Sequence, residues 1–211
     1  LLKENGIKVV HVISNLKFAK KSEEVGVDAI VCEGFEAGGH NGKEEITTMC
    51  LIPNVSENVH IPVIAAGGIG NGKAMLAAFS LGAEGVQIGS RFVASKECSA
   101  HPNFKEAVVE AKEGDTMLSL KQLTAVRLLN NKFYQKVVEA ENRGDSIEKL
   151  RELLGKGRSK RGMFEGNLQE GELEIGQVSS MINEIKPVKE IIDEIISDFN
   201  TEKERISKIE F

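Results

Sequence analysis

Residues 63–73 read Val63-Ile64-Ala65-Ala66-Gly67-Gly68-Ile69-Gly70-Asn71-Gly72-Lys73, and this stretch decides the fold. A short apolar run ends in paired glycines and leads into a pattern typical of a helix. Apolar runs of this length are typical of strands that are buried on both faces, as in a parallel sheet. Glycines at such a strand end allow backbone N–H groups to approach an anion, because no Cβ atom stands in the way. The stretch therefore predicts a strand, an anion-binding loop and a helix.

The same unit recurs along the first hundred residues. Short apolar runs predict strands at Lys8–Ile13, Ala29–Glu33, Pro62–Ala66 and Gly85–Ile88. Helical patterns lie between them at Leu16–Val25, Ile46–Asn58 and Lys73–Leu81. Three segments also share the order helix end, glycine, apolar residue, charged residue and strand; they begin at Asn5, Val25 and Leu81. Alternating βα units of this kind predict an α/β fold with right-handed crossovers.

Four strands are too few to close an eight-stranded barrel, which takes about 250 residues. The chain also begins with Leu1 and a segment that reads as the end of a helix, with Gly6 as its left-handed terminator. We therefore expect residues 1–101 to form the C-terminal half of a (β/α)8 TIM barrel, namely its last four βα units. The expected fold class is α/β.

A helical region is expected from Pro102 to the C-terminus. Helical spacing covers Lys121–Asn142, a capping box and Gly155 mark the ends of a second helix, and Pro187–Phe199 predicts a terminal helix. The polar, glycine-rich segment Gly155–Gly176 is expected to be a loop or lid over the barrel mouth. Residues 102–211 would thus form a helical lid and C-terminal helices packed on the barrel.

Composition excludes several classes of function. The net charge of −5, without long runs of one sign, argues against binding to nucleic acid. No apolar run is long enough to span a membrane and no signal peptide is visible, so we expect a cytoplasmic protein. Cys32, Cys50 and Cys98 have no metal-ligand spacing, and we expect reduced thiols and no metal site.

Two consecutive strand ends predict a phosphate site. After Ala66 come Gly67 and Gly68, and the next strand leads through Gln87 and Ile88 into a glycine and a hydroxyl residue, Gly89-Ser90. In TIM barrels the loops after the last two strands commonly form a phosphate site. Tight turns without a ligand are the alternative explanation.

A second glycine-rich stretch follows the strand Ala29–Glu33. It reads Glu33-Gly34-Phe35-Glu36-Ala37-Gly38-Gly39-His40-Asn41-Gly42. Four glycines in ten residues indicate a sharp backbone bend or close contact with a ligand. His40 would lie at the barrel mouth, where an imidazole suits acid–base catalysis near neutral pH. An ordinary loop histidine remains the alternative.

The other polar candidates have structural explanations. We expect His11 to fill the barrel, His60 to lie at the opposite end of the strands, and His101 to cap or pack a helix. The basic cluster of Lys156, Arg158, Lys160 and Arg161 is typical of a solvated loop, although it could contact an acidic carrier protein or a nucleotide phosphate.

The motifs Glu33–Gly42, Ala65–Ile69 and Gln87–Phe92 resemble, in order and spacing, the nitronate monooxygenase (2-nitropropane dioxygenase) family, which includes the flavin-type enoyl-ACP reductases. The resemblance extends through Ser99–Lys105 and Gly171–Gln177. The Glu-Ala-Gly-Gly-His element is its most distinctive part, since the phosphate glycines are shared by many FMN barrels.

The resemblance implies an FMN-binding barrel and a role for each matching residue. Gly67 and Gly68, with Gly89 and Ser90, would hold the FMN phosphate. Glu33, Gly38 and Gly39 would line the flavin and the ribityl chain, and His40 would stand beside the substrate. The implied flavin site also includes Ala66, Gln87 and Gln177.

The resemblance leaves three activities open. Glu33-Gly34 and the Ser99–Lys105 stretch favour an enoyl-ACP reductase of fatty-acid synthesis, which would use NADH or NADPH on a small-molecule or carrier-bound enoyl thioester. A nitronate monooxygenase that consumes O2 is the alternative, and Asn41 fits neither pattern. A flavin-binding protein without turnover is the third reading, and a homodimer is a family expectation.

Overall fold

The computed structural model describes residues 1–210 and divides the chain into two compact units. Unit 1 comprises residues 1–36, 44–88 and 192–211, and unit 2 comprises residues 37–43 and 89–191. These boundaries differ from the expected division at residue 101. The short segment 37–43 belongs with residues far along the chain, and the C-terminal helix belongs largely with the N-terminal βα units.

Unit 1 is built on a parallel sheet of four strands. The strands are β1 (Val10–Ile13), β2 (Ala29–Glu33), β4 (Val63–Ala66) and β5 (Gly85–Gln87), in the spatial order β1-β2-β4-β5. Each strand is parallel to its neighbour; Glu33, for example, is opposite Ala66. All four strands were predicted from their apolar runs, and the parallel α/β architecture is confirmed.

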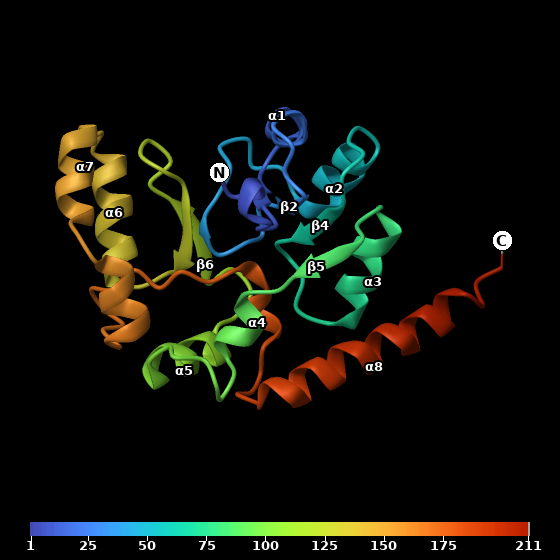
Figure 1. Cartoon of the computed structure of the whole chain (residues 1–211). Coiled ribbons are helices and arrows are strands. Elements are labelled where there is room, and N and C mark those ends of the chain that lie inside the picture. Colours follow the sequence, from blue (N-terminus) through green and yellow to red (C-terminus); the bar gives the residue numbers. More distant parts are fainter. Residues whose placement is uncertain (211) are drawn as a thin grey trace. The chain divides into compact units, whose positions relative to one another are not determined.

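Three helices connect these strands and lie along the outside of the sheet (Figure 1). They are α1 (Leu16–Glu24), α2 (Thr48–Ser56) and α3 (Gly72–Ser80), each within two residues of its predicted bounds. Asn15 and Asn71 begin α1 and α3 by accepting a hydrogen bond from the amide three residues later, as expected of N-cap residues. The helices bury their apolar faces against the strands in a core centred on Ile30, Leu51, Ile52 and Ala65.

The C-terminal helix α8 (Val188–Ile206) packs its later part against α3 within unit 1. The Asp198 side chain accepts a hydrogen bond from the Lys73 amide at 3.0 Å, and the rings of Phe79 and Phe199 meet edge to face at 5.8 Å. At Gly72 the two backbones approach so closely that a Cβ atom would lie 2.1 Å from the Phe199 nitrogen.

Strand β1 corrects one expectation. Val10 and Val12 are 50% and 48% exposed, and His11 is exposed too, so this strand is not buried on both faces. The reason is that β1 pairs with β2 alone in the described sheet and lies at its edge. That His11 fills a barrel interior stays a prediction, because the four described strands do not enclose such an interior.

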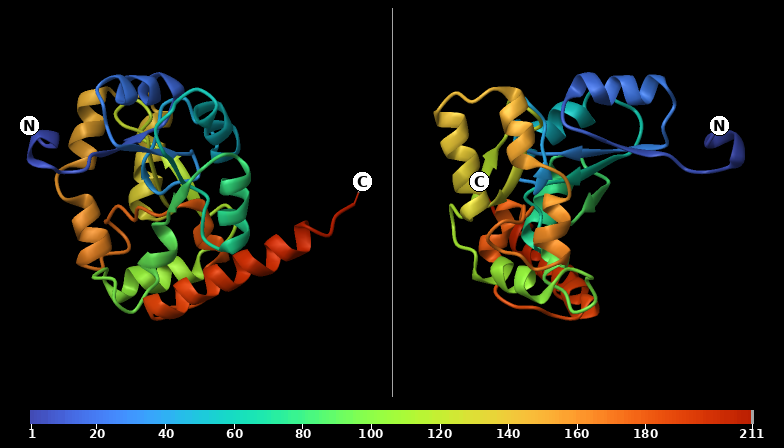
Figure 2. Two further views of the ribbon diagram at one scale, coloured as in Figure 1. Left: turned by 45° about the vertical axis from the view of Figure 1, so that its right-hand side comes forward. Right: turned by 90° about the vertical axis from the view of Figure 1, so that its left-hand side faces the viewer.

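Unit 2 contains a small antiparallel sheet with the order β3-β7-β6. The strands are β3 (Gly39–His40), β6 (Thr116–Ser119) and β7 (Val126–Leu129). Its helical elements are α4 (Ser90–Val93), α5 (Pro102–Glu110), α6 (Lys132–Asn142), α7 (Ile147–Leu154), the π-helix η2 (Lys160–Phe164) and the 3-10 helix η3 (Gln177–Met181). Figure 2 shows these elements in two further views.

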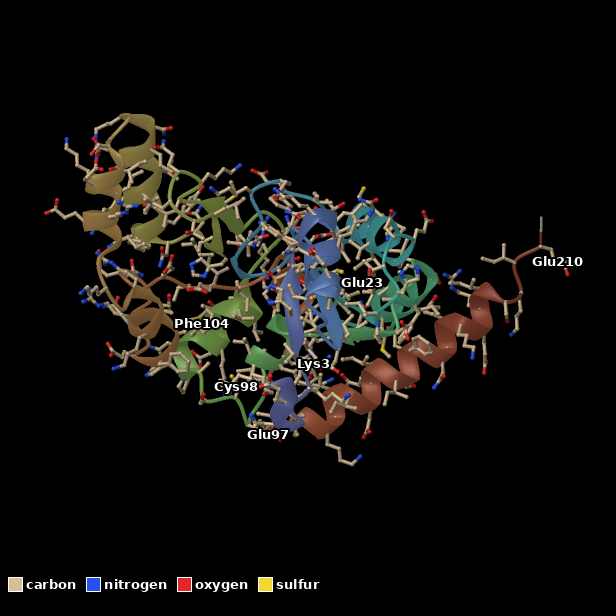
Figure 3. All side chains as sticks on the ribbon, turned by 45° about the horizontal axis from the view of Figure 1, so that its top comes forward. Lys3, Glu23, Glu97, Cys98, Phe104 and Glu210 are labelled. Atoms are coloured by element: carbon tan, nitrogen blue, oxygen red, sulfur yellow. The ribbon has the colours of Figure 1, made fainter. Side chains whose placement is uncertain are left out.

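Unit 2 has two apolar clusters, and one of its carboxylates, that of Glu97, caps the first residue of α8. Phe104, labelled in Figure 3, is buried in the cluster with Val108, Leu173 and Ile175, whereas Phe133 lies in the other. The Glu97 carboxylate, also labelled there, accepts a hydrogen bond from the Val188 amide at 2.9 Å. A carboxylate suits this position because the first amides of a helix lack partners within the helix.

The expectation of an all-helical region after Pro102 is wrong. Residues 116–119 and 126–129 are strands, so the helix predicted for Lys121–Asn142 begins only at Lys132. All four residues of β7 are buried, and a strand buried on both faces has no alternating pattern to separate it from a helix. The segment Gly155–Gly176, expected to be a loop or lid, includes the π-helix η2. No helix described here is both long and apolar enough to cross a membrane.

Replacing Gly72 by alanine tests the packing of α8 on α3. An alanine in a helix normally gains about 0.5–1 kcal/mol over glycine. Here we expect the free energy of unfolding to fall by about 1–3 kcal/mol, because the added methyl group overlaps the backbone of α8. Urea unfolding followed by circular dichroism measures the change. The control is Ser80→Ala at the exposed end of α3; a Gly72→Ala protein as stable as this control would contradict the packing.

Candidate functional site

The ends of β2 and β4 form a tight backbone junction in unit 1. The Gly34 amide donates a hydrogen bond to the Ala66 carbonyl at 2.9 Å. Gly67 has a φ of +86°, and a Cβ atom there would lie 2.7 Å from the Gly34 carbonyl oxygen. A side chain on Gly34 would in turn overlap the Thr48 hydroxyl. Both glycines are therefore required by contact between protein backbones.

Gly68 differs from Gly67 in what surrounds it. Its φ is +71°, but a Cβ atom would meet only the Glu36 side chain, at an ordinary contact distance of 3.5 Å. Backbone strain, and not packing, is thus the local reason for glycine at this position. Two successive residues with positive φ turn the chain sharply after β4, where the sequence predicted a phosphate loop.

Glu36 has a structural role that the sequence did not reveal. Its carboxylate accepts a hydrogen bond from the Thr48 amide, which lies 3.0 and 3.2 Å from the two carboxylate oxygens. Thr48 is the first residue of α2, where a negative charge is favoured by the unpaired amides and the helix dipole. The Thr48 hydroxyl also donates to the Gly67 carbonyl at 2.9 Å, which ties the helix start to the glycine turn.

The remaining predicted residues of unit 1 lie at the same strand ends. Glu33 ends β2 and is half-buried, Ala66 ends β4 and is buried, and Gln87 ends β5 and is exposed. Because adjacent parallel strands end at the same edge, the sheet brings these three residues and the Gly67-Gly68 turn to one edge.

Gly38 and Gly39 fit against residues 174–176 within unit 2. A Cβ atom on Gly38 would lie 2.4 Å from the Ile175 carbonyl carbon, and one on Gly39 would lie 2.8 Å from a Glu174 carboxylate oxygen. Gly39 also has a φ of +78°. The glycines of this motif thus permit close packing of the strand that carries His40.

Ser90 joins the same region of unit 2. Its Oγ accepts a hydrogen bond from the Gly176 amide at 2.9 Å, so the hydroxyl hydrogen can still be donated to another group. Gly89 precedes it as the N-cap of α4, and a Cβ atom on Gly89 would meet nothing within 4 Å. Gln177 follows Gly176 directly, begins η3 and is exposed.

His40 is exposed and lies on the short strand β3, opposite Val126 of β7. Its electrostatic neighbourhood includes the buried Glu172, whose side chain shares the Ser159 hydroxyl with Glu174. Burial is the main reason that the pKa of Glu172 is raised above its ordinary value, and the Glu174 charge adds to this shift.

Residues 172–175 were missed as functional candidates. The alternation Glu172-Leu173-Glu174-Ile175 is a sequence signal for an extended segment, with charged residues on one face and apolar residues on the other. The sequence gives no signal that Ser159 lies beside them, because that contact joins residues more than a dozen positions apart.

His101 and His60 have the structural roles that were expected, whereas Arg158 of the basic cluster differs from the expected solvated loop. His101 caps α5 by accepting from the Asn103 amide at 3.1 Å, and His60 is exposed beside Glu23. Arg158 of the basic cluster donates to three backbone carbonyls and stacks on Phe133 at 4.7 Å. Arg158 therefore supports the fold of unit 2 and is not a loop residue free in solvent.

Cys32 is buried, and the described acidic, histidine and cysteine side chains form no cluster of three. Burial raises the pKa of the Cys32 thiol to about 12, which keeps it protonated and unreactive near neutral pH. None of the described His, Cys, Asp and Glu side chains gather in threes as a metal site requires.

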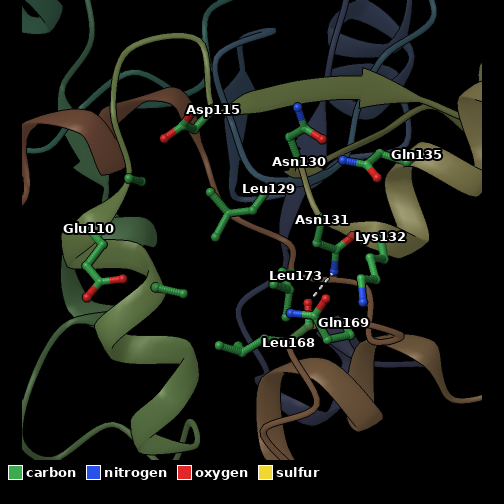
Figure 4. A pocket seen from close by; sticks show the side chains of 12 residues that line it. Glu110, Asp115, Leu129, Asn130, Asn131, Lys132, Gln135, Leu168, Gln169 and Leu173 are labelled. Carbon is green, nitrogen blue, oxygen red and sulfur yellow. Dashed lines mark hydrogen bonds between the residues drawn. The ribbon is translucent and has the colours of Figure 1, made fainter.

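A separate pocket of about 560 Å³ lies in unit 2 (Figure 4). Glu110 of α5 and Asp115 face it on one side, and Lys132 and Gln135 of α6 face it on the other. Its lining contains none of the residues predicted to bind a cofactor or to act in catalysis. Its charges do not converge on one point, and we assign it no ligand.

Each unit contains some of the residues predicted to bind the flavin. Unit 1 provides the glycine turn at Gly67-Gly68, and unit 2 provides His40, the donor hydroxyl of Ser90 and the open backbone at Gly89. Within unit 2, backbone without Cβ obstruction at Gly89 and a hydroxyl hydrogen that Ser90 can donate are suited to an anion.

Three relatives place this chain among known proteins. FabK from Thermotoga maritima is 44% identical with a TM-score of 0.92, and the match covers 98% of this chain and 65% of that chain. A nitroalkane oxidase from Streptomyces ansochromogenes is 25% identical with a TM-score of 0.82, over 97% of this chain and 61% of that one. A probable nitronate monooxygenase of Staphylococcus aureus strain JH9 is 38% identical over 150 residues, which are 66% of this chain and 42% of that protein.

The chain thus spans less than half the length of the staphylococcal relative and 65% of FabK. The close structural matches confirm an α/β fold of the TIM-barrel class. The sequence model of the family described as nitronate monooxygenase matches residues 1–198, nearly the whole sequence. This chain belongs to the nitronate monooxygenase family, a family of oxidoreductases.

Proposed function

We propose that the protein is an FMN-dependent enoyl-ACP reductase, which uses NADH or NADPH to reduce the double bond of an enoyl thioester. The observation that carries this proposal is the likeness to FabK, at 44% identity over 98% of this chain, against 25% for the nitroalkane oxidase. The Glu33-Gly34 pair, which resembles the reductase branch, supports the same choice.

A nitronate monooxygenase that oxidises alkyl nitronates with O2 is the second candidate. It is favoured by the family match and by the staphylococcal relative. Both candidates would use the same flavin site and the same histidine, so they differ in substrate and in the electron donor or acceptor.

The groups that would hold FMN are those that the family resemblance implies. The Gly67-Gly68 turn, Gly89 and the Ser90 hydroxyl would bind the phosphate, and Glu33, Ala66 and Gln87, with Gly38, Gly39 and Gln177, would line the rest of the cofactor. Bound flavin would supply hydride transfer, which no protein side chain performs.

His40 would be the residue that donates or accepts a proton in the reaction. In enoyl reduction, one hydrogen reaches the β-carbon as hydride and a proton must reach the α-carbon, and His40 would donate that proton. In the monooxygenase reaction the same imidazole would act as a base. Its exposure on β3 leaves it accessible to a substrate in either case.

Gly89→Ala tests the phosphate site without disturbing the fold. Gly89 has a φ of −105°, and a Cβ atom there meets nothing within 4 Å, so we expect the thermal midpoint to stay within about 1 °C of the parent. If the backbone at Gly89 contacts the FMN phosphate, the methyl group obstructs it and the Kd for FMN rises about 10-fold or more. Fluorescence titration with FMN measures the affinity.

Riboflavin is the matched control for this variant, because it lacks the phosphate. We expect its Kd to be the same for the parent and for Gly89→Ala. Unchanged FMN affinity, or an equal loss for both ligands, would remove Gly89 from the phosphate site.

His40→Ala tests the acid–base role in the complete protein. Turnover of crotonyl thioester is expected to fall by about 10²–10⁴-fold, the usual contribution of a general acid. Reduction of the flavin by NADH or NADPH should be unaffected, because that step needs no proton from His40. Anaerobic stopped-flow absorbance separates the two steps, and His60→Ala, an exposed histidine in unit 1, is the control.

The same instrument separates the candidate functions. Bleaching by NADH or NADPH followed by reoxidation with the enoyl thioester is the result expected of a reductase. Bleaching by propionate 3-nitronate alone would move the protein to the monooxygenase branch. Flavin binding without bleaching by either reagent would indicate a protein without turnover.

A further inference from the structure

Three ionisable side chains share one face of the small sheet in unit 2. His40 is opposite Val126, and Glu174 bridges Leu128 two residues along the same strand. The Leu129 amide donates to the Leu173 carbonyl at 2.9 Å, so residues 172–174 extend the edge that β3 begins. Because side chains alternate along a strand, His40, Glu172 and Glu174 lie on the same side, whereas Leu173 and Ile175 pack on the opposite side in the cluster with Phe104.

A single hydroxyl links the two carboxyl groups. Ser159 Oγ lies 3.0 Å from Glu172 Oε2 and 2.5 Å from Glu174 Oε1. A serine hydroxyl has one hydrogen to donate, whereas an ionised carboxylate can only accept. Both contacts are satisfied together when one carboxyl group carries a proton and donates it to Ser159 Oγ, while the serine hydrogen is donated to the other.

The proton belongs on Glu172. This residue is 6% exposed, whereas Glu174 is half-buried and so nearer to water. Burial raises the pKa of Glu172, and the neighbouring Glu174 charge raises it further. The opposing positive groups are His40 and Arg158, and each lowers the pKa of Glu172 by less than burial raises it.

We propose that Glu172, Ser159 and Glu174 form a proton store that reloads His40. The proposal rests on the proposed function, in which His40 gives a proton to the substrate. The O–H bond of Glu172 breaks as its proton moves to Ser159 Oγ, and the serine hydrogen passes to the Glu174 carboxylate. Glu174 then protonates the neutral imidazole, directly or through one water, and the negative charge remains on Glu172 until solvent restores its proton.

Carboxyl titration tests the hydrogen-bonded chain without cofactor or substrate. In 13C NMR of glutamate-labelled protein, we expect the Glu172 carboxyl to titrate above the ordinary glutamate value, with Glu172→Gln identifying its signal. In the proposed arrangement Glu172 donates its proton to Ser159 Oγ, a hydrogen bond that favours the protonated form, so Ser159→Ala should lower the Glu172 midpoint. Glu174→Gln removes a like charge and should lower the midpoint as well. A rise, or no shift, in either variant would overturn the hydrogen-bonded network.

Turnover measurements test whether the proton store supplies His40 during catalysis. We expect Ser159→Ala to lower kcat for the enoyl thioester about 10-fold or more, with the loss greatest at high pH, where solvent supplies protons slowly. Ser159→Thr keeps a hydroxyl and should restore most of the rate. Glu165→Gln, which removes an exposed carboxylate paired with Lys160, is the matched control and should leave kcat unchanged.

The outcomes separate this proposal from the proposed function. If His40→Ala loses turnover while Ser159→Ala and Glu172→Gln keep the parent kcat and pH profile, the proton store is wrong and the role of His40 stands. If His40→Ala keeps full turnover, the proposed role of His40 is wrong, and the store fails as a device that serves it, even if the expected NMR shifts are observed. Glu172→Gln also covers the case in which Ser159→Ala does not fold.

Discussion

The contact between the backbones of Gly34 and Gly67 is the constraint on which the site in unit 1 depends. The Gly34 amide bonds to the Ala66 carbonyl, and the space beyond is too small for a Cβ atom on Gly67. This contact joins the ends of β2 and β4, and the Thr48 hydroxyl fastens the start of α2 to the same turn. Any side chain at either glycine would separate the strand ends that carry Glu33 and Ala66.

Glycines also allow close backbone contact in unit 2, where the contact positions a side chain and does not join two strand ends. Gly38 and Gly39 allow β3 to lie against residues 174–176, and this places His40 on the face that holds Glu174. The glycines beside a catalytic candidate therefore need not contact a ligand themselves. Here they bring the histidine close to a pair of carboxyl groups, and Gly89 and Gly68 remain as the positions whose surroundings leave room for a cofactor.

Burying Glu172 in this place carries a free-energy cost that the fold must offset. A buried carboxyl group is tolerated when it is neutral and hydrogen-bonded, and the Ser159 hydroxyl meets the second condition. Removing one partner of a buried polar network is usually destabilising, so Glu172 and Ser159 depend on each other within unit 2.

The sequence alone determined the order of the βα units, their helix caps and the two glycine-rich strand ends. These features depend on neighbouring residues: Asn15 and Asn71 cap helices a few positions away, and apolar runs such as Ala29–Glu33 are recognisable in isolation. Only the tertiary structure decided that residues 126–129 form a strand, that Gly38 packs on Ile175, and that Ser159 joins Glu172 to Glu174. Each of these depends on partners distant in the chain, and no local pattern specifies which distant residue will supply the contact.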